Sequence, residues 1–480
     1  MTYENTLAFA RQLDQQDPLR AFRNQFHLPQ HNNRDAIYFC GNSLGLQPKA
    51  TRDAIDRELT VWQNLGVEGW FAPSRDAPDE PWLSVHKRCQ PLLAEVVGAL
   101  PAEVVPMNNL TVNMHLMLTS FYRPDGHKTK ILTIGGDFPS DQYAFETHIR
   151  QRGLDPAETL IEVFPRDNQD AEPEYTWRMA DILSAIDRHH ESLALVLMSG
   201  LHYYTGQVFD MRAIAAKAHQ YAIPVGFDLA HAIGNVPLHL HEWGVDFAFW
   251  CSYKYLNSGP GGVSGVFIHE KHHHRTLPRM AGWWGYDEAR RFEMTKGFVP
   301  EPGAAGWQLG TPNVLAMAAH RAALQITAEA GLPAMRQKSE LLTGYLEFVI
   351  HQSGLPITLM TPANLTERGC QLSLLIESNG KAVFTYLTDR GIIGDWREPN
   401  CIRLAPTPLY NTFEEVWRVG EALRLFRARV RVLGFLFQPF FGVEIGPPKQ
   451  MTDCNFHVVP GCAGTQVKPK DRAFLLRQKR

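Results

Sequence analysis

The chain has 480 residues, of which 44% are hydrophobic and 20% are charged. This composition excludes a wholly disordered chain, and the length is sufficient for two or three domains. Lys and Arg total 47 against 50 for Asp and Glu, a net charge of −3, so we expect no general attraction to nucleic acid or to an anionic membrane. Seven cysteines without a CxxC pair predict no disulfide framework, and residues 1–18 do not have the pattern of a signal peptide. Because no run approaches 20 apolar residues, we expect a cytoplasmic protein.

The N-terminal two thirds of the chain predict a helical arm followed by a large domain. Residues 1–35 are expected to form the arm, because apolar residues recur at helical spacing around Pro18. Residues 36–330 are expected to form an α/β domain around a mainly parallel sheet, because short apolar runs alternate with amphipathic helical stretches. The expected strands include Ile131–Ile134, Ala194–Met198, Ile223–Phe227 and Phe247–Trp250. The expected helices include Trp177–Arg188, Met211–Tyr221 and Val314–Ala330.

The last third of the chain changes composition twice. Residues 331–430 contain two strand-like runs, Gln371–Glu377 and Cys401–Ala405, between amphipathic helical stretches, and are expected to form a smaller α+β domain. Residues 431–480 are rich in Phe at first and then in Pro, Gly, Lys and Arg. We assign this tail to neither domain.

Two charged residues follow neighbouring buried strands of the predicted sheet. Asp228 ends the run IPVGFD, and Lys254 follows the run FAFWCSY. Ligands of open parallel sheets bind at the carboxyl ends of the strands, and buried charges there require partners. A lysine amine forms a Schiff base with the aldehyde of pyridoxal phosphate, and an acid pairs with its protonated ring nitrogen. The pair therefore predicts pyridoxal phosphate as the cofactor.

Other segments supply what this cofactor requires. Asn108, Asn109 and Thr111 precede a helical pattern, and the free N–H groups of a helix N-terminus bind phosphate. Phe138 offers a face for ring stacking beside Ser140 and Asp141, and the glycines of NSGPGG (257–262) allow a sharp turn after the lysine. Each feature alone is more often a helix cap or a solvated side chain. Their combination in one chain favours the cofactor site.

Six segments of the chain together resemble kynureninase, a family of pyridoxal-phosphate enzymes in the fold-type I, class V aminotransferase group. They are YFCGNSLGLQPK (38–49), NLTVN (109–113), FPSDQYA (138–144), FDLAHAIGN (227–235), WCSYKYLN (250–257) and IRLAPTPLYN (402–411). The resemblance extends from about residue 36 to 425. It implies the fold-type I architecture and the hydrolysis of L-kynurenine or 3-hydroxy-L-kynurenine to anthranilate or 3-hydroxyanthranilate and L-alanine, in tryptophan catabolism or in NAD biosynthesis.

The resemblance also implies a role for each matching residue. Lys254 would hold the Schiff base, Asp228 would pair with the ring nitrogen, and Tyr253 is our candidate for a general acid near the phosphate. The cofactor would contact Leu110, Thr111, Phe138, Pro139, Ser140, Asp141, Ser199, His231 and Tyr253, with Trp283 and Thr311 contributed by the neighbouring subunit of a homodimer.

Arg403 would bind the α-carboxylate of the substrate. A guanidinium fork makes two parallel charge-assisted bonds to a carboxylate, so lysine would be a poor replacement. Asn42, Ser43 and Trp70 are expected to shape the substrate pocket.

Two alternatives share the cofactor. A cysteine desulfurase would need a nucleophilic cysteine on a mobile loop, and Cys401 instead begins the apparent strand that carries Arg403. A pyridoxal-phosphate-binding protein without turnover would not require Asp228, Tyr253, Lys254 and Arg403 together. An NAD dehydrogenase is not favoured, because no GxGxxG opens a helix after a strand.

The histidine-rich segments are not predicted to bind a metal. His272, His273 and His274 are adjacent, so their side chains point in different directions and rarely share one ion. His239 and His241 could lie on one face of a strand, but no acidic or cysteine partner follows at ligand spacing, so we expect surface histidines.

Overall fold

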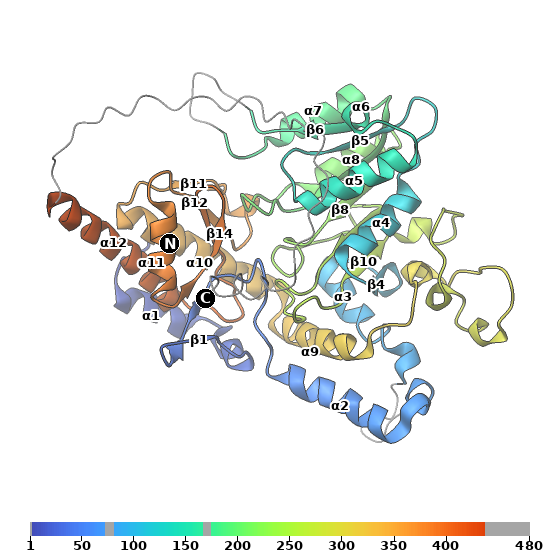
Figure 1. Cartoon of the computed structure of the whole chain (residues 1–480), viewed down its shortest axis with the longest axis horizontal. Helices are drawn as coiled ribbons and strands as arrows, with labels where there is room; N and C mark the ends of the chain where they lie inside the picture. Colours follow the sequence, from blue (N-terminus) through green and yellow to red (C-terminus); the bar gives the residue numbers. More distant parts are fainter. Residues whose placement is uncertain (1, 73–80, 167–173, 437–480) are drawn as a thin grey trace, which may run out of the picture. The chain divides into compact units, whose positions relative to one another are not determined.

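The structure, a computed structural model, describes residues 2–72, 81–166 and 174–436, and of 430–436 it describes only the backbone (Figure 1). Residues 1–431 form one compact unit. The predicted tail, 431–480, lies outside the described residues except for the end of the last helix. Among the helices that the structure describes, none has both the length and the apolar character needed to cross a bilayer.

A seven-stranded sheet organises the larger part of the chain, in the order β4-β10-β9-β8-β7-β5-β6. The five strands from β9 to β6 are parallel, and β10 is antiparallel to both of its neighbours, β9 and β4. This confirms the predicted mainly parallel sheet. The strands are β4 (Val104–Pro106), β5 (Lys130–Ile134), β6 (Leu160–Val163), β7 (Leu193–Ser199), β8 (Val225–Asp228), β9 (Phe247–Trp250) and β10 (Gly265–Ile268).

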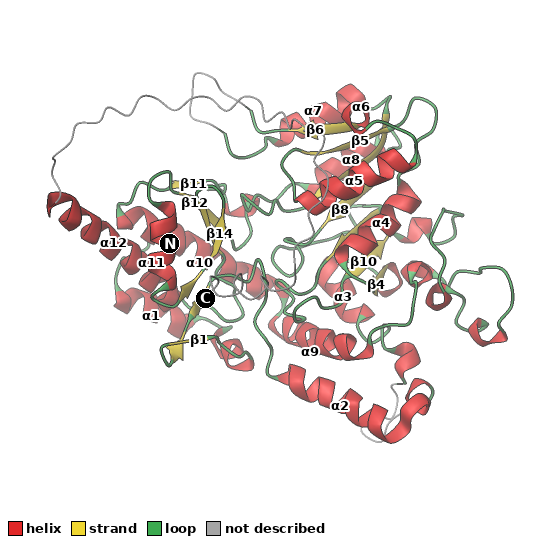
Figure 2. Cartoon of the chain, viewed as in Figure 1, coloured by secondary structure: helices red, strands yellow, loops and turns green. Residues whose placement is uncertain are grey.

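Helices cover both faces of this sheet (Figure 2). In β7, Val196 and Met198 belong to an apolar cluster with α3, α7 and α8, whereas Leu195 and Leu197 belong to a second cluster with α4 and α5. Successive side chains of a strand point to opposite faces, so a strand buried on both faces is a continuous apolar run, as the sequence of β7 is. The helices are α2 (Ala50–Leu65), α3 (Gln90–Val97), α4 (Leu110–Phe121), α5 (Pro139–Gln151), α6 (Pro156–Thr159), α7 (Met179–His189), α8 (Met211–His219) and α9 (Val314–Ala330).

The predicted elements agree with the structure apart from their ends. α9 has the predicted bounds, whereas β8 starts at Val225 rather than Ile223 because Pro224 has no N–H to donate to the ladder. α7 starts at Met179 rather than Trp177, whose amide instead donates to the side chain of Gln207 at 2.9 Å.

A second sheet forms from the residues after α9, in the order β11-β12-β15-β14, and all its pairs are antiparallel. Its core also contains Ala10 and Leu13 of α1. The predicted boundary at residue 330 falls at the turn between α9 and α10, where Gly331 has a φ of +72°. The elements are α1 (Leu7–Gln16), α10 (Leu332–Ser353), β11 (Thr358–Leu359), β12 (Leu372–Leu375), α11 (Gly380–Thr388), β14 (Asp395–Arg397), β15 (Cys401–Leu404) and α12 (Phe413–Leu436).

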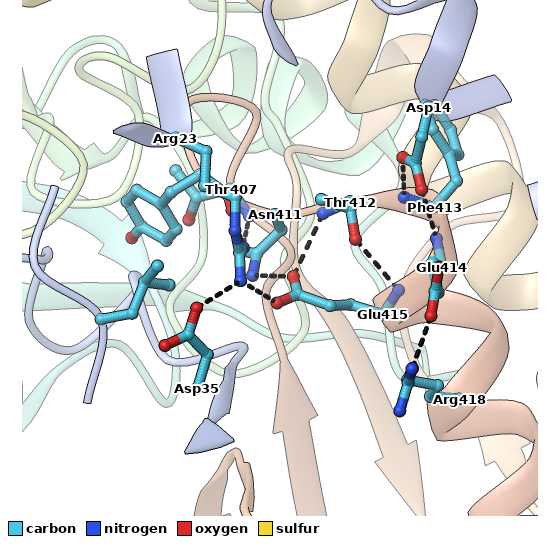
Figure 3. A network of polar contacts seen from close by, with 12 residues as sticks. Asp14, Arg23, Asp35, Thr407, Asn411, Thr412, Phe413, Glu414, Glu415 and Arg418 are labelled. Carbon is cyan, nitrogen blue, oxygen red and sulfur yellow. Dashed lines mark hydrogen bonds and ion pairs between the residues drawn. The ribbon is translucent and has the colours of Figure 1, made fainter. Parts of the chain in front are cut away.

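The N-terminal arm is bound to the start of α12 by polar contacts (Figure 3). The backbone amides of Phe413 and Glu414 donate to the carboxylate of Asp14 at 2.7 and 3.0 Å. Arg23 forms an ion pair with the buried Glu415 at 2.8 Å, and Lys338 of α10 forms another with Asp17 at 2.7 Å. The first N–H groups of a helix have no partner within the helix, so Asp14 caps α12 from a distant part of the chain.

We expect Asp14→Ala to lower the free energy of unfolding by about 1–2 kcal/mol, because it leaves two N–H groups of α12 without their acceptor. Urea denaturation of the variant and the parent protein measures the change. Asp56→Ala is the matched control, since Asp56 is an exposed aspartate within α2. Equal losses in the two variants would contradict the capping role.

Candidate active site

A cavity of about 220 Å³ opens at the carboxyl edge of the large sheet. The lining residues come from segments far apart in the sequence, including both sheets and the loop that precedes α2. They are Asn42, Ser43, Leu110, Thr111, Asp137, Phe138, Ser140, Ser199, Leu201, Tyr203, Asp228, Ala230, His231, Tyr253, Lys254, Arg397 and Arg403.

Asp228 and Lys254 meet at this edge because their strands are neighbours. β8 pairs in parallel with β9, with Asp228 opposite Phe249, and Lys254 lies in the turn that follows β9. The Lys254 Nζ atom lies 2.9 Å from Nε2 of His231. A Cβ atom at Gly45 would collide with the carbonyl oxygen of Lys254 and with Asn257, so this glycine allows the GNSLG loop to pack against the lysine turn.

Burial controls the protonation of the groups around Lys254. It raises the pKa of Asp228 to about 6, although the amide of Ala230 and the Lys254 amine act in the opposite direction. Burial, reinforced by the nearby Asp228, raises the pKa of Asp141 well above its usual value. Burial and the nearby Lys254 lower the pKa of His231 well below its usual value, so the imidazole facing the amine is neutral.

Asp137 is a residue of the site that the sequence analysis missed. Its carboxylate accepts the backbone amides of Phe138 at 2.9 Å and of Ser199 at 3.1 Å. It therefore holds together the carboxyl ends of β5 and β7, and with them two of the predicted cofactor contacts. Asp137 lies three residues after β5 and directly after two glycines. It could have been predicted in the same way as Asp228, as an acidic residue at the carboxyl end of a buried strand.

The start of α4 forms one end of the cavity. Asn109 is the N-cap, and its side chain accepts the amide of Val112 at 3.0 Å. The Thr111 and Ser140 hydroxyls lie 3.1 Å apart, so the first turns of α4 and α5 converge. Hydroxyls beside the free amides of a helix N-terminus form an anion site, which fits the predicted phosphate position.

The opposite end contains two arginines and an aspartate. Arg403 is 1% exposed, and its guanidinium donates to the carbonyl of Tyr203 at 2.6 Å, to the hydroxyl of Ser43 at 3.2 Å and to the carboxylate of Asp395. Asp395 is the cross-strand partner of Arg403, and Arg397 also donates to it at 3.1 Å. Burial would raise the pKa of Asp395, but Arg403 and Ser43 outweigh burial and hold it below its usual value.

This arginine end carries an excess of positive charge. The two arginines contribute +2 and Asp395 contributes −1, which leaves +1 for a bound anion. The buried Nε atoms of Arg397 and Arg403 have no hydrogen-bond partner in the described part of the chain. One substrate carboxylate would neutralise this end of the cavity.

Five predicted site residues do not line the cavity. Pro139 and Asp141 lie in the first turn of α5, directly beside lining residues. Trp70 instead packs its ring against Trp82 at 5.4 Å and Trp284 at 5.6 Å.

Trp283 and Thr311, the other two of the five, are both exposed at the surface. Their predicted role depends on a second subunit and stays a prediction.

The residues present fit pyridoxal phosphate. The Ser199 hydroxyl and the Nδ1 atom of His231 are buried without a hydrogen-bond partner among the described residues, so the cavity has polar groups available for a ligand. The carboxyl groups of Asp141 and Asp228 would be stabilised in their charged form by a protonated ring nitrogen. The Lys254 amine and the anion site at α4 complete the set that the cofactor requires.

Comparisons with known proteins identify the family of the chain. The model of the kynureninase C-terminal domain matches residues 335–423. The kynureninase of Xanthomonas campestris pv. campestris (strain B100) is 50% identical over 433 residues, which cover 89% of this chain and 100% of the relative. The chain belongs to the kynureninase family. The kynureninase of Flavobacterium psychrophilum is 47% identical over 429 residues, 88% of this chain and 99% of the relative.

Solved structures show the same fold outside the kynureninase family. The cysteine desulfurase CsdA from Escherichia coli has a TM-score of 0.68 at 16% identity, over 86% of this chain and 98% of that protein. A mutant of C-DES with glycine covalently linked to its PLP cofactor has a TM-score of 0.67 at 20% identity, over 84% of this chain and 98% of that protein. These matches confirm the predicted fold-type I architecture.

We expect Asp137→Asn to weaken the binding of pyridoxal phosphate about tenfold, because the amide side chain loses the charge that orients Phe138 and Ser199. Equilibrium titration of the apoprotein, followed by cofactor absorbance, measures the change.

Asp155→Asn is the matched control, since Asp155 caps the short helix α6 at the surface. If cofactor affinity is unchanged in Asp137→Asn, the positioning role is wrong.

Proposed function

We propose that the chain hydrolyses the Cβ–Cγ bond of L-kynurenine or 3-hydroxy-L-kynurenine, with pyridoxal phosphate bound at Lys254. The products are anthranilate or 3-hydroxyanthranilate and L-alanine. The observation that carries the proposal is the meeting of Asp228, Lys254 and Arg403 around one cavity in a member of the kynureninase family. The predicted cytoplasmic location of this activity stays a prediction.

The bound cofactor supplies an electron sink for carbanions formed on an amino-acid substrate. Asp228 holds the positive charge of the ring nitrogen that this chemistry needs. Its burial makes the pairing strong, because a carboxylate in a low-dielectric site gains more from an opposite charge than one in water.

Lys254 takes the α-proton of the substrate and returns a proton during turnover. The neutral imidazole of His231, 2.9 Å from the amine, is available as a hydrogen-bond partner in either protonation state of the lysine. A base within hydrogen-bond reach of the reacting carbon is the geometric condition for general base catalysis. Lys254 lines the cavity that the substrate would occupy.

Tyr253 is the proposed general acid for the later steps, in which water adds to the γ-carbonyl and the Cβ–Cγ bond breaks. Burial raises the pKa of its phenol, so the group keeps its proton until a basic atom approaches it. The residue also lines the cavity, and its carbonyl accepts the amide of Gly45 at 2.8 Å, which fixes the backbone beside the GNSLG loop.

Arg403 binds the substrate α-carboxylate, and we assign Arg397 as its second ligand. Asp395 is shared by the two arginines, so it holds both guanidinium groups on the cavity side of β14 and β15. The net charge of +1 at this end is matched by one carboxylate. Ser43, hydrogen-bonded to Arg403, adds a neutral donor at the same place.

We further propose a homodimer in which Trp283 and Thr311 complete the partner's cofactor site. Apolar side chains support this proposal, because a contiguous exposed apolar surface indicates an interface. Phe71 and Phe292 are 51% and 49% exposed and lie 5.6 Å apart, and Trp283 packs against Phe292 at 5.6 Å.

The test is an assay of the cofactor-loaded protein with L-kynurenine, 3-hydroxy-L-kynurenine and L-cysteine, with products identified by mass spectrometry. We expect an anthranilate and alanine from at least one kynurenine. Lys254→Ala should abolish turnover together with the visible absorbance of the lysine-bound cofactor, whereas Lys217→Ala, at an ion pair on α8, should retain both.

Two outcomes would contradict the proposal. Alanine from L-cysteine alone would indicate a desulfurase, although Cys370 and Cys401 are both 0% exposed. Cofactor absorbance without any product would indicate a binding protein without turnover.

We expect Arg397→Gln to raise the KM for the kynurenine substrate about fivefold to tenfold with little change in kcat, because the α-carboxylate contact is the same in the ground and transition states. Steady-state kinetics separates the two parameters. Arg418→Gln is the control, since Arg418 pairs with Glu414 on the surface of α12. An unchanged KM in Arg397→Gln would remove Arg397 from the substrate site.

A further inference from the structure

The helices α4 and α5 run side by side in the same direction, with both N-termini at the cavity. The hydroxyls of Thr111 and Ser140, in the first turns of the two helices, lie 3.1 Å apart. At the other end, Arg152 directly follows α5 and donates to the carbonyls of Leu118 and Tyr122 at 3.4 and 3.0 Å. The two helix starts therefore meet at one end of the pair, and the two helix ends meet at the other.

A pair of histidines joins the two helices between these points. Nδ1 of His115 in α4 lies 2.9 Å from Nε2 of His148 in α5. The ring centroids are 5.0 Å apart, so the imidazoles meet edge to edge rather than stack. In this arrangement an N–H of one ring lies in the ring plane and points at the nitrogen of the other, as a hydrogen bond requires.

Arg152 determines which nitrogen of each histidine carries the proton. Its Nη1 lies 3.0 Å from Nδ1 of His148, and because a guanidinium can only donate, this nitrogen is the acceptor. The proton of His148 is therefore on Nε2 and is donated to Nδ1 of His115. The proton of His115 is then on its own Nε2. The hydrogen bonds run in one direction, from Arg152 through His148 to His115.

This chain of hydrogen bonds is largely removed from water. His148 is 4% exposed, and burial lowers its pKa to about 4, with His115 and Arg152 acting in the same direction. Burial also lowers the pKa of His115. Both rings are therefore neutral near pH 7, as the chain of hydrogen bonds requires. A buried N–H without its acceptor is costly, so the bond between the rings opposes any separation of α4 from α5.

The spacing of the two helices matters because their N-termini converge. Each N-terminus carries a partial positive charge, so the starts of α4 and α5 repel each other beside Thr111 and Ser140. An anion between them attracts the unpaired N–H groups of both helices at once. His115 lies four residues after Thr111, on the same face of α4. A contact at His115 therefore controls how closely Thr111 approaches α5.

We propose that His115 and His148 are positioning residues for the phosphate of pyridoxal phosphate. Their hydrogen bond sets the spacing of the two helix N-termini, and through it the spacing of the Thr111 and Ser140 hydroxyls around the phosphate. Neither histidine lines the described cavity, so the pair acts through the helices and not by contact with the cofactor. This inference rests on the proposed cofactor site.

The test compares pyridoxal phosphate with pyridoxal, which has no phosphate group. Each is titrated into the apoprotein, and the absorbance of the lysine-bound form gives its affinity. We expect His115→Leu to weaken the binding of pyridoxal phosphate about tenfold and that of pyridoxal less than about twofold, because the buried N–H of His148 loses its acceptor and the helix starts separate. His115→Asn should bind both as the parent does, since its Oδ1 can take the place of Nδ1 as acceptor.

His351→Leu is the matched control and should also bind both as the parent does. His351 lies in α10, and its side chain is 61% exposed. Thermal denaturation of each apoprotein shows whether it is folded. His115→Ala is a second variant without the acceptor, for use if leucine does not pack in the space of the imidazole.

Three outcomes would overturn the proposal. Equal losses for pyridoxal phosphate and pyridoxal would mean that the pair supports the whole pocket rather than the phosphate site. Unchanged affinity in the folded His115 variants, or the same loss in His115→Asn as in His115→Leu, would remove the hydrogen bond from the phosphate site. A parent apoprotein that binds no pyridoxal phosphate would instead contradict the proposed function, and this inference with it.

Discussion

Buried charge at the carboxyl edge of the parallel sheet determines how the rest of the site is built. Asp137, Asp141 and Asp228 are all at least nine-tenths buried, and Lys254 is the one lysine lining the described cavity. The site accommodates this excess of acid in three ways: burial and Asp228 raise the pKa of Asp141, two backbone amides donate to Asp137, and Asp228 is left to pair with a cation. Each of these three arrangements depends on how the neighbouring strands β5, β7, β8 and β9 place the residues at their carboxyl ends.

The arginine end of the cavity depends on contacts between the two sheets. Arg403 belongs to β15 of the second sheet, yet its guanidinium donates to the carbonyl of Tyr203, which follows β7 of the first. Gln371 likewise donates to the carbonyls of Tyr203 and Tyr204 and accepts the side-chain amide of Asn42. The substrate site is therefore assembled from residues of both sheets, and its geometry depends on these hydrogen bonds.

Local patterns in the sequence predicted the features that are determined by residues close together in the chain. The bounds of α9 and the positions of Asp228 and Lys254 follow from apolar runs and the residues that end them. Cross-strand register is not visible in such runs, so Asp395 was missed although it faces Arg403 directly. The short strands β4, β6 and β10 were missed for the same reason, since only their pairing distinguishes them from loops.

The histidines also show that sequence patterns do not reveal partners from distant segments. His241 was predicted to be a surface residue and its side chain is 36% exposed, but its acidic partner Glu103, 138 residues earlier and 3.0 Å away, was not predicted. Spacing rules detect polar partners only when one local segment carries them. In this chain Glu103 and His241 belong to segments that meet only after the sheet has formed.

The cap on α12 has a consequence for synthesis of the chain. Asp14 and its hydrogen-bond partner Phe413 are separated by 399 residues. At a translation rate of roughly 5–20 residues per second, α1 leaves the ribosome about 20–80 s before the helix that it caps has been made. During that interval the apolar face of α1, including Ala10 and Leu13, lacks the α12 side of its core. The first and last helices of the described chain can therefore be joined only after nearly all of the described residues have been made.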